Sequence, residues 1–371
     1  MNKISNNSSQ LKKFLELFGI FTDPIIGIDI CSSSVKVMEI AQTEDKYFIK
    51  NFAVEKLNVG DVVEKNIKNK EAVIQALNKA LAKTKISSHL GCISIPNSVA
   101  ISKVIQLENG LDEKEIFNEI ELESDRYIPY DLEDVNLDFE VLGPSKIGNN
   151  LMDVILVATK KENIKIRTSI LEAVGLHPKI IDVESLSVER VFNMFIANNL
   201  PDGAKNKLIG LFDIGSTSTS LNVFHDLRLV YSKDHAFGGQ QLLDEIQKRY
   251  GLTLQEAILA RKHNDLPDDY NVDVLEPYRN KIAQQVVRAC QVFFSSAEYT
   301  KFDYICLTGG TSNLPGIDET IADLLKIKII IVNPLKSFNV ADYIPTEIFT
   351  EESLGLINCC GLALRNFTRK L

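Results

Sequence analysis

Two turns in this sequence place an aspartate at the end of an apolar segment, followed by small and hydroxylic residues. The first turn contains Asp29 followed by Cys31, Ser32, Ser33 and Ser34, and the second contains Asp213 followed by Gly215, Ser216, Thr217 and Ser218. Short side chains let backbone N–H groups approach an anion closely, and hydroxyl groups add donors. A carboxylate beside a phosphate suits a hydrated Mg²⁺ ion, which prefers oxygen ligands. Because the two turns lie about half the chain apart, we expect a nucleoside triphosphate held between two matched loops.

Two glycine pairs could approach other parts of such a ligand. Gly309 and Gly310 follow an apolar segment and precede an expected helix, so a base or ribose could lie against their backbone. Gly238 and Gly239 precede the expected helix 240–250, whose N-terminal N–H groups could face a phosphate. Either pair alone is more often a tight turn, so this interpretation depends on the two aspartate turns.

The elements expected around these residues form two similar halves. A strand–turn–strand–strand pattern opens at residue 25 and again at residue 208. The first half is expected to contain strands 25–30, 35–41, 47–56, 92–95 and 179–183 with helices 71–84 and 184–198. The second is expected to contain strands 208–213, 220–225, 227–235, 304–307 and 328–332 with helices 240–250, 254–263, 277–301 and 317–325. Two halves of one α/β pattern that face each other create a cleft.

A different pattern interrupts the first half. Residues 99–178 are expected to form a small α+β unit with strands 99–107, 135–142 and 153–159 and helices 112–127 and 163–174. Segment 11–21 has the periodicity of a short amphipathic helix, 343–352 is expected to be a loop, and 353–368 an apolar helix. The expected domains are a 1–23 N-terminal amphipathic arm, a first domain of 24–98 and 179–204, an inserted 99–178 unit, a 205–352 second domain and a 353–371 C-terminal helix that packs back on the first domain.

Composition excludes several classes of protein. The 371 residues carry a formal net charge of −9, which gives no overall attraction to nucleic acid or to anionic lipid. No apolar run approaches the ~20 residues of a membrane span, and no secretory signal is expected. The six cysteines lack the spacing of a zinc site, so we expect free thiols in a reducing cytoplasm. The five histidines are expected to be structural, and neither a serine-hydrolase elbow nor a Walker-type phosphate loop occurs.

Segments 29–36, 213–219 and 307–316 resemble the phosphate-one, phosphate-two and adenosine motifs of the actin-like ATPase superfamily. Within it, the chain resembles the PilM family of type IV pilus assembly proteins. The resemblance covers nearly the whole chain and includes residues 27–30, 34–36, 181–184, 237–239 and 361–365. It implies an actin-like ATPase fold, in which two duplicated RNase H-like domains surround a nucleotide cleft and one carries a small inserted α+β subdomain.

The resemblance also implies ATP and Mg²⁺ as cofactors. Backbone amides of 31–34 would hold the β-phosphate with Lys36 reaching the phosphates, and 215–218 would hold the γ-phosphate. Asp29 and Asp213 would orient Mg²⁺ through water. The other nucleotide contacts would come from Gly238, Gly239, Arg261, Gly309, Gly310, Ser312 and Leu314, with Arg261 where relatives present a lysine.

Glu184 matches the position at which relatives keep a residue that positions the attacking water. The alternative is an ordinary carboxylate at a helix start, where it complements the helix dipole. Cys31 stands where the superfamily often has glycine, so we expect nucleotide binding with at most slow ATP hydrolysis.

The partner that the resemblance implies is the N-terminal cytoplasmic tail of PilN, held in a groove beside the 99–178 unit. PilN would bring the protein to the PilN/PilO/PilP complex, and to the pilus motor ATPases, at the cytoplasmic face of the bacterial inner membrane. Membrane contact would then be indirect. The expected helix 11–21 either packs on its own domain or forms a second contact with the partner or the membrane. The alternatives are an FtsA-like cell-division protein, whose relatives end in an amphipathic membrane helix, and a small-molecule kinase, which needs an aspartate base beside an acceptor pocket.

Overall fold

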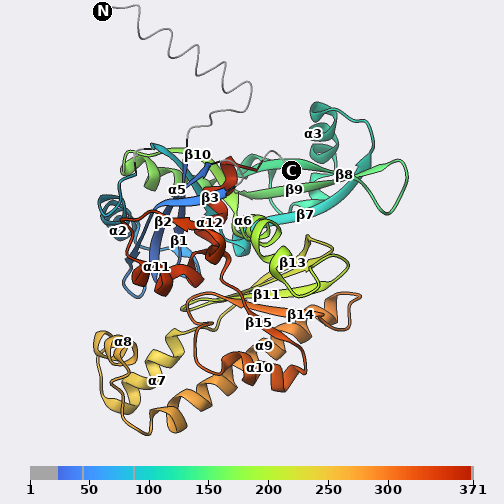
Figure 1. The fold of residues 1–371 in the computed structure, drawn as a ribbon. Coiled ribbons are helices and arrows are strands. Elements are labelled where there is room, and N and C mark those ends of the chain that lie inside the picture. The colour runs from blue at the N-terminus through green and yellow to red at the C-terminus, as the bar shows by residue number, and fades with distance from the viewer. Residues whose placement is uncertain (1–23, 44–45, 87, 369–371) are drawn as a thin grey trace, which may run out of the picture.

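Two mixed β-sheets with the same strand order form the centre of the molecule (Figure 1). The computed structural model describes residues 24–43, 46–86 and 88–368, so the expected helix 11–21 lies outside the described residues. The first sheet has the order β10-β6-β1-β2-β3-β16, and the second has the order β13-β12-β11-β14-β15. In each, three consecutive strands pair antiparallel and two later strands continue in parallel from the first of them.

The strands of the two sheets are close to those expected. The first sheet consists of β1 (Ile25–Ile30), β2 (Ser34–Thr43), β3 (Lys46–Lys56), β6 (Leu90–Ile95), β10 (His177–Val183) and the short β16 (Asn339–Val340). The second consists of β11 (Leu208–Ile214), β12 (Thr219–His225), β13 (Arg228–His235), β14 (Tyr304–Thr308) and β15 (Ile329–Ile331). The repeated strand order agrees with the two duplicated α/β domains of the expected actin-like ATPase fold.

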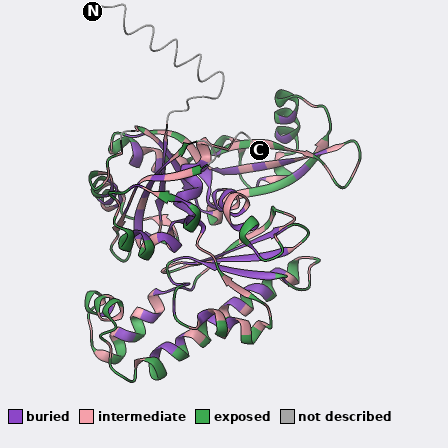
Figure 2. Cartoon of the chain, viewed as in Figure 1, coloured by how far each residue is buried: buried purple, intermediate pink, exposed green. Residues whose placement is uncertain are grey.

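Helices cover both faces of each sheet, which is why the central strands β1 and β11 are almost entirely buried (Figure 2). Helices α2 (Lys70–Ala82) and α5 (Lys161–Ala173) pack on one face of the first sheet. On the other face lie α6 (Glu184–Val191) and α12 (Ile357–Ala363), which also contact the second sheet and form a core common to both domains. Within this core the rings of Phe192 and Phe224 stack with centroids 3.8 Å apart.

Helices α9 (Glu276–Ser296) and α10 (Ile317–Leu325) cover the remaining face of the second sheet. Helices α7 (Gln240–Tyr250) and α8 (Leu254–His263) lie at one end of this sheet, beside the cleft (Figure 1). Helix α7 ends where Gly251 adopts a left-handed φ of 67°, a conformation that glycine adopts without strain. Helix α9 ends before the expected residue 301, and a π-helical turn, Asn271–Leu275, leads into it.

The inserted unit is a three-stranded antiparallel sheet with a helix on one face. Strands β7 (Ala100–Glu108), β9 (Leu151–Lys160) and β8 (Val135–Pro144) pair in that order. The expected helix 112–127 is divided at Glu123 into α3 (Glu113–Leu122) and α4 (Ser124–Tyr127). Helix α5 was expected within this unit, but its buried Ile170 and Leu171 pack in the core of the first domain. It therefore lies with the first domain.

Two expectations near the C-terminus are wrong, and one hairpin at the cleft was not expected. Segment 343–352 contains α11 (Thr346–Glu352), because Phe349 is buried against Phe52. The apolar segment from 353 is not one helix: 3-10 turns Ser353–Leu356 and Leu364–Asn366 flank α12. The hairpin of β4 (Val62–Val63) and β5 (Asn66–Ile67) was not expected, since strands of two residues carry no periodic pattern.

Candidate functional site

A cavity of 270 Å³ lies between the two domains and is lined by both aspartate turns. It brings together most of the residues expected to bind a nucleotide: Asp29, Cys31, Ser32, Ser33, Ser34, Lys36, Glu184, Asp213, Gly215, Ser216, Thr217, Ser218, Gly239, Arg261 and Gly310. Residues from the first third, the middle and the last third of the chain thus meet at one point. Four of the expected residues, Gly238, Gly309, Ser312 and Leu314, are not among those that line it.

These four residues lie behind the cavity wall. Gly238 packs under the second turn, where an added Cβ would lie 2.6 Å from the carbonyl oxygens of Gly215 and Ser216. Ser312 is buried and donates its hydroxyl to the Gly309 carbonyl at 2.7 Å, and Leu314 packs in the core of the second domain. Their contribution to the site is to shape the loops that line it.

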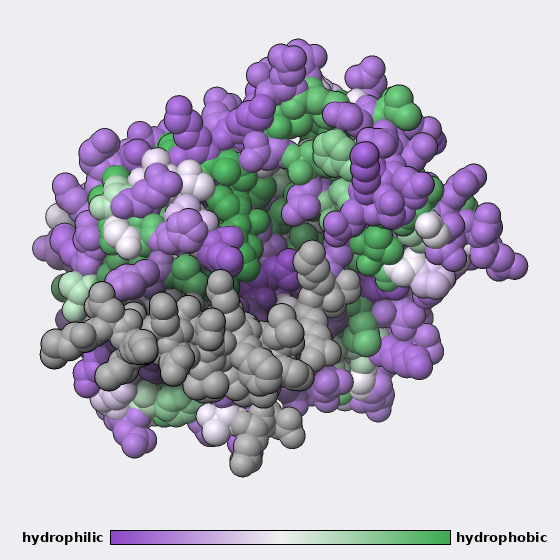
Figure 3. Space-filling view, turned by 90° about the horizontal axis from the view of Figure 1, so that it is seen from above, coloured by the Kyte–Doolittle hydropathy of each residue, from purple (hydrophilic) through white to green (hydrophobic). Residues whose placement is uncertain are grey.

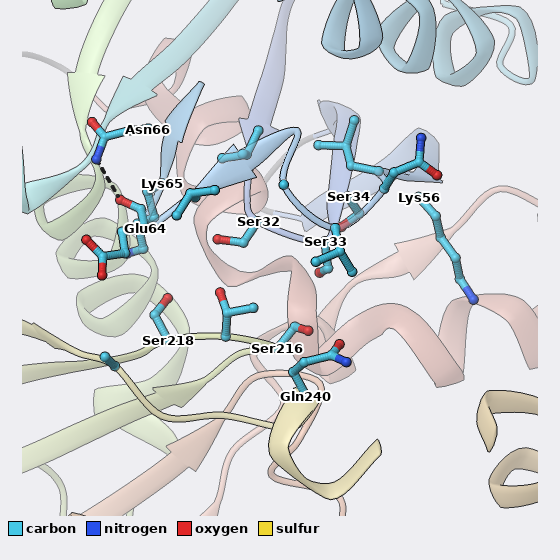
Figure 4. Close-up of a pocket in the computed structure, with 18 of the residues that line it drawn as sticks. Ser32, Ser33, Ser34, Lys56, Glu64, Lys65, Asn66, Ser216, Ser218 and Gln240 are labelled. Atoms are coloured by element: carbon cyan, nitrogen blue, oxygen red, sulfur yellow. Dashed lines mark hydrogen bonds between the residues drawn. The ribbon is translucent and has the colours of Figure 1, made fainter. Parts of the chain in front are cut away.

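The two aspartate turns have the same backbone structure. The N–H of Cys31 donates to the Ser34 carbonyl at 3.0 Å, and the N–H of Gly215 donates to the Ser218 carbonyl at 3.0 Å. Figure 4 shows Ser32 and Ser33 on one side of the space and Ser216 and Ser218 on the other. The hydroxyl oxygen of Ser32 is buried without a hydrogen-bond partner. Donors from both domains therefore converge on one space, as an anion with several oxygens requires.

The carboxylate of Asp29 is held from two sides. Lys36 donates to its Oδ2 at 3.1 Å and Asn358 donates to its Oδ1 at 2.8 Å. Lys36 also donates to the Gly355 carbonyl at 2.7 Å. Burial acts to lower the pKa of Lys36, but the surrounding Cys31, Asp29 and Asp213 outweigh it and raise the pKa well above its ordinary value. The lysine is therefore a fixed positive charge in the cavity wall.

Asp213, the counterpart of Asp29 in the second domain, lines the same cavity. Burial raises its pKa above the ordinary value, although Lys36 and Lys65 oppose this shift. Gly309, with a φ of 92°, packs against Asp213, and an added Cβ would lie 2.5 Å from the Ile214 carbonyl oxygen. A cation bound beside Asp213 would lower the pKa of this carboxyl group again.

The residues present fit a nucleotide better than a metal ion alone. Within the described residues, no group of three or more His, Cys, Asp or Glu side chains could hold a metal ion. Mg²⁺ is commonly bound through one or two carboxylates together with phosphates and water, so Asp29 and Asp213 would suffice beside a nucleotide. An added Cβ at Gly310 would meet nothing within 4 Å, so this backbone faces open space.

Lys65 is a site residue that the sequence did not predict. Its ammonium donates to Glu184 Oε2 at 2.5 Å, to Ser220 Oγ at 3.0 Å and to Asp234 Oδ1 at 3.1 Å. Lys65 and Glu184 come from the first domain and the other two from the second, so the ammonium bridges the cleft. Glu64 and Lys65 form the hairpin turn with φ of 49° and 63°, which costs about 1 kcal/mol or more for each residue.

Burial raises the pKa of Glu184 to about 7, because Lys65 only partly offsets the desolvation and Asp234 and Asp29 add to it. A carboxyl group of this pKa can take up or release a proton near neutral pH. The Oδ2 atom of Asp234 is buried without a hydrogen-bond partner. No signal in the sequence singles out Lys65, which lies in a polar loop.

Two further cavities are relevant to ligands. One of 850 Å³ adjoins the cleft between the β4–β5 hairpin and helices α7 and α8, and it shares the serine-rich turns with the first cavity (Figure 4). Another of 670 Å³ lies on the inserted unit and is lined by Asp125, Ile128, Pro129, Tyr130, Asp131, Asp134, Lys160, Lys161 and Glu162. Figure 3 shows a mostly hydrophilic face on which hydrophobic side chains gather beside a hollow.

Among the described residues, no helix has the length and the apolar character needed to cross a membrane.

Comparison with known proteins identifies relatives of the whole fold. The family model of the type IV pilus assembly protein PilM matches residues 27–367. The solved structure of a PilM-PilN type IV pilus biogenesis complex is similar with a TM-score of 0.76 and 22% identity, over 93% of this chain and 99% of that chain. The ethanolamine utilization protein EutJ from Carboxydothermus hydrogenoformans is similar with a TM-score of 0.54 and 15% identity, over 96% of this chain and 99% of that chain.

Proposed function

The chain belongs to the family of the type IV pilus assembly protein PilM, and we propose that it binds ATP with Mg²⁺ and holds the cytoplasmic tail of PilN. In this function nucleotide is a ligand of the cleft, and the output is the recognition of a partner. Hydrolysis is at most slow and uses Glu184 to position water. Family membership favours this role over an FtsA-like role in cell division and over a small-molecule kinase.

The observation that carries nucleotide binding is the pair of turns, each closed by the same backbone hydrogen bond, that face each other across the cleft. Each follows an aspartate and would offer backbone N–H groups and hydroxyls to phosphate oxygens. Lys36 adds a fixed positive charge, and the open space at Gly310 suits a base or ribose. ATP supplies phosphate oxygens that, with Asp29 and Asp213, would complete the ligands of one Mg²⁺ ion.

The partner site that we propose is the 670 Å³ cavity of the inserted unit. A PilM structure that is similar to this chain is a complex with PilN. The cavity is lined mainly by charged residues together with three less polar ones: Asp125, Asp131, Asp134, Lys160, Lys161 and Glu162 beside Ile128, Pro129 and Tyr130. An extended peptide binds such a groove through a few buried side chains and backbone hydrogen bonds.

Through PilN the protein would be recruited to the cytoplasmic face of the inner membrane. Contacts with PilO, PilP and the motor ATPases would follow from that recruitment. The membrane contact of the chain itself would remain indirect.

Two calorimetric titrations test the proposal. ATP·Mg²⁺ should bind the purified protein and should not bind Asp213→Ala. A synthetic PilN tail peptide should bind with an affinity that Tyr130→Ala lowers at least tenfold, or ~1.4 kcal/mol. Phe117→Ala is the matched control, because Phe117 is a half-exposed ring on the same unit outside the cavity. Equal peptide affinity in both variants would place the PilN site elsewhere, and no heat with ATP would remove the nucleotide from the proposal.

A further inference from the structure

Arg167, in the middle of α5, is a buried cation that the proposed site does not use. Its side chain is 4% exposed, and among the described residues no carboxylate lies within ion-pair distance of it. Burial lowers its pKa below the ordinary value. Keeping a charge in such a place is costly unless every donor is satisfied. The guanidinium is held by carbonyl oxygens, and those carbonyls belong to functionally distinct parts of the protein.

Two of the carbonyls lie directly behind the nucleotide cleft. Nη2 of Arg167 donates to the Lys65 carbonyl at 3.3 Å, and the ammonium of the same lysine bridges the cleft. Nε donates to the Ser94 carbonyl at 2.9 Å. The hydroxyl of Ser94 accepts from Asn358, which in turn donates to Asp29. Arg167 therefore contacts the backbone that supports Lys65 and, through Ser94 and Asn358, the side chain of Asp29 in the phosphate site.

The third carbonyl leads to the cavity of the inserted unit. Nη1 of Arg167 donates to the Asn163 carbonyl at 3.3 Å, and the Asn163 amide donates to Thr159 Oγ1 at 3.1 Å. The next residues toward the N-terminus of α5, 160–162, line the 670 Å³ cavity. Farther along, Ile170 and Leu171 anchor α5 in the core of the first domain. One helical turn thus separates the cavity from the arginine.

From these contacts we infer that the first turns of α5 couple the nucleotide cleft to the cavity of the inserted unit, with Arg167 as the positioning residue. The inference rests on the proposed function, since it requires one ligand in each place. Lys65, which contacts Glu184 and Asp234 in the cleft, would turn its ammonium toward a bound phosphate, and the β4–β5 hairpin would move with it. Arg167, which donates to both the Lys65 and Asn163 carbonyls, would then shift the first turns of α5. The effect is reciprocal, because the coupling free energy between two sites is shared by both ligands.

The test measures linkage. The affinity of the full chain for the PilN tail peptide is determined by calorimetry without nucleotide and with saturating ATP·Mg²⁺, in the wild type, in Arg167→Met and in Lys165→Met. Lys165 is an exposed cation on the same helix, so its variant controls for the loss of a charge. We expect nucleotide to change the peptide affinity about fivefold or more in the wild type and in Lys165→Met. In Arg167→Met we expect less than a twofold change, with both ligands still binding.

Each outcome separates this inference from the proposed function. If ATP or the peptide does not bind the wild type, the proposed function fails and the inference falls with it. If both bind without coupling, or if Arg167→Met keeps the full coupling, only the inference is overturned. Should Arg167→Met not fold, amide hydrogen exchange of the wild type decides. Nucleotide must alter the exchange of residues 163–167, and unchanged exchange there overturns the inference.

Discussion

The ammonium of Lys65 lies 2.5 Å from Oε2 of Glu184, although the two residues are 119 positions apart in the chain. Both are largely buried, and the same ammonium contacts Asp234 from the other domain. One cation thus neutralises two carboxylates at the place where the two domains meet. The β4–β5 hairpin is thereby tied to residues of both domains.

Replacing Lys65 with methionine should destabilise the protein. The change leaves Glu184 and Asp234 buried near each other without their cation, and breaking a buried ion pair in this way costs about 3–5 kcal/mol. The thermal unfolding midpoint should fall by several degrees, and ATP·Mg²⁺ affinity should fall with it. Lys83→Met is the control, because Lys83 pairs with Glu55 at the surface with a side chain that is 62% exposed. Equal losses in both variants would contradict a special role for Lys65.

Glu184 should make the stability depend on pH. Its pKa is about 7 in the folded protein and 4.5 ordinarily, so the folded state binds the extra proton between these values. Stability from this group is therefore present below pH 4.5 and is lost as pH rises through 7, by up to ~3 kcal/mol. Glu184→Gln lacks this loss and should gain stability relative to wild type from pH 5 to pH 8. Urea unfolding at both pH values measures the difference, and parallel curves would refute the assignment.

Much of the cleft could be predicted from the sequence because its determinants are local. An aspartate followed by small and hydroxylic residues is visible within eight positions, and the repeat of that pattern in the second half revealed the duplicated domain. The cross-cleft contacts of Lys65 were not predictable in this way. Its three partners are 119, 155 and 169 positions away, and its two-residue strands have no periodicity.

The same reasoning explains which assignments failed. Helix α5 follows the inserted strands in sequence, but its apolar face packs against α2 and β1 of the first domain. The position of α5 in the sequence did not reveal which domain it packs against. Ser312 and Leu314 lie within the expected adenosine motif. The Ser312 hydroxyl, however, donates to the Gly309 carbonyl, and Leu314 packs in the core of the second domain. A short motif marks a loop without telling which of its side chains face the ligand.

Two adjacent glycines should respond differently to alanine. Gly309 has a φ of 92° and packs against Asp213 and the Ile214 backbone, so Gly309→Ala should destabilise the fold by at least ~1–3 kcal/mol and abolish nucleotide binding. At Gly310 an added Cβ meets no protein atom within 4 Å, so Gly310→Ala should keep the unfolding midpoint within a degree or two. Because its methyl group would project toward the ligand space, it should still weaken ATP binding severalfold. A Gly310→Ala protein with unchanged ATP affinity would exclude the base or ribose from this backbone.

Cys31 should be the thiol that reports nucleotide binding. All six cysteines lie in the described residues, and Cys31 alone among them is not fully buried. Burial raises the pKa of Cys92, Cys290, Cys306, Cys359 and Cys360, which leaves these thiols protonated and unreactive. N-ethylmaleimide should therefore label the native protein once, at Cys31, and ATP·Mg²⁺ should slow the labelling. Cys31→Ser should remain unlabelled, as mass spectrometry of the intact chain can show. Labelling at an unchanged rate with saturating nucleotide would mean that the first turn does not contact the phosphates.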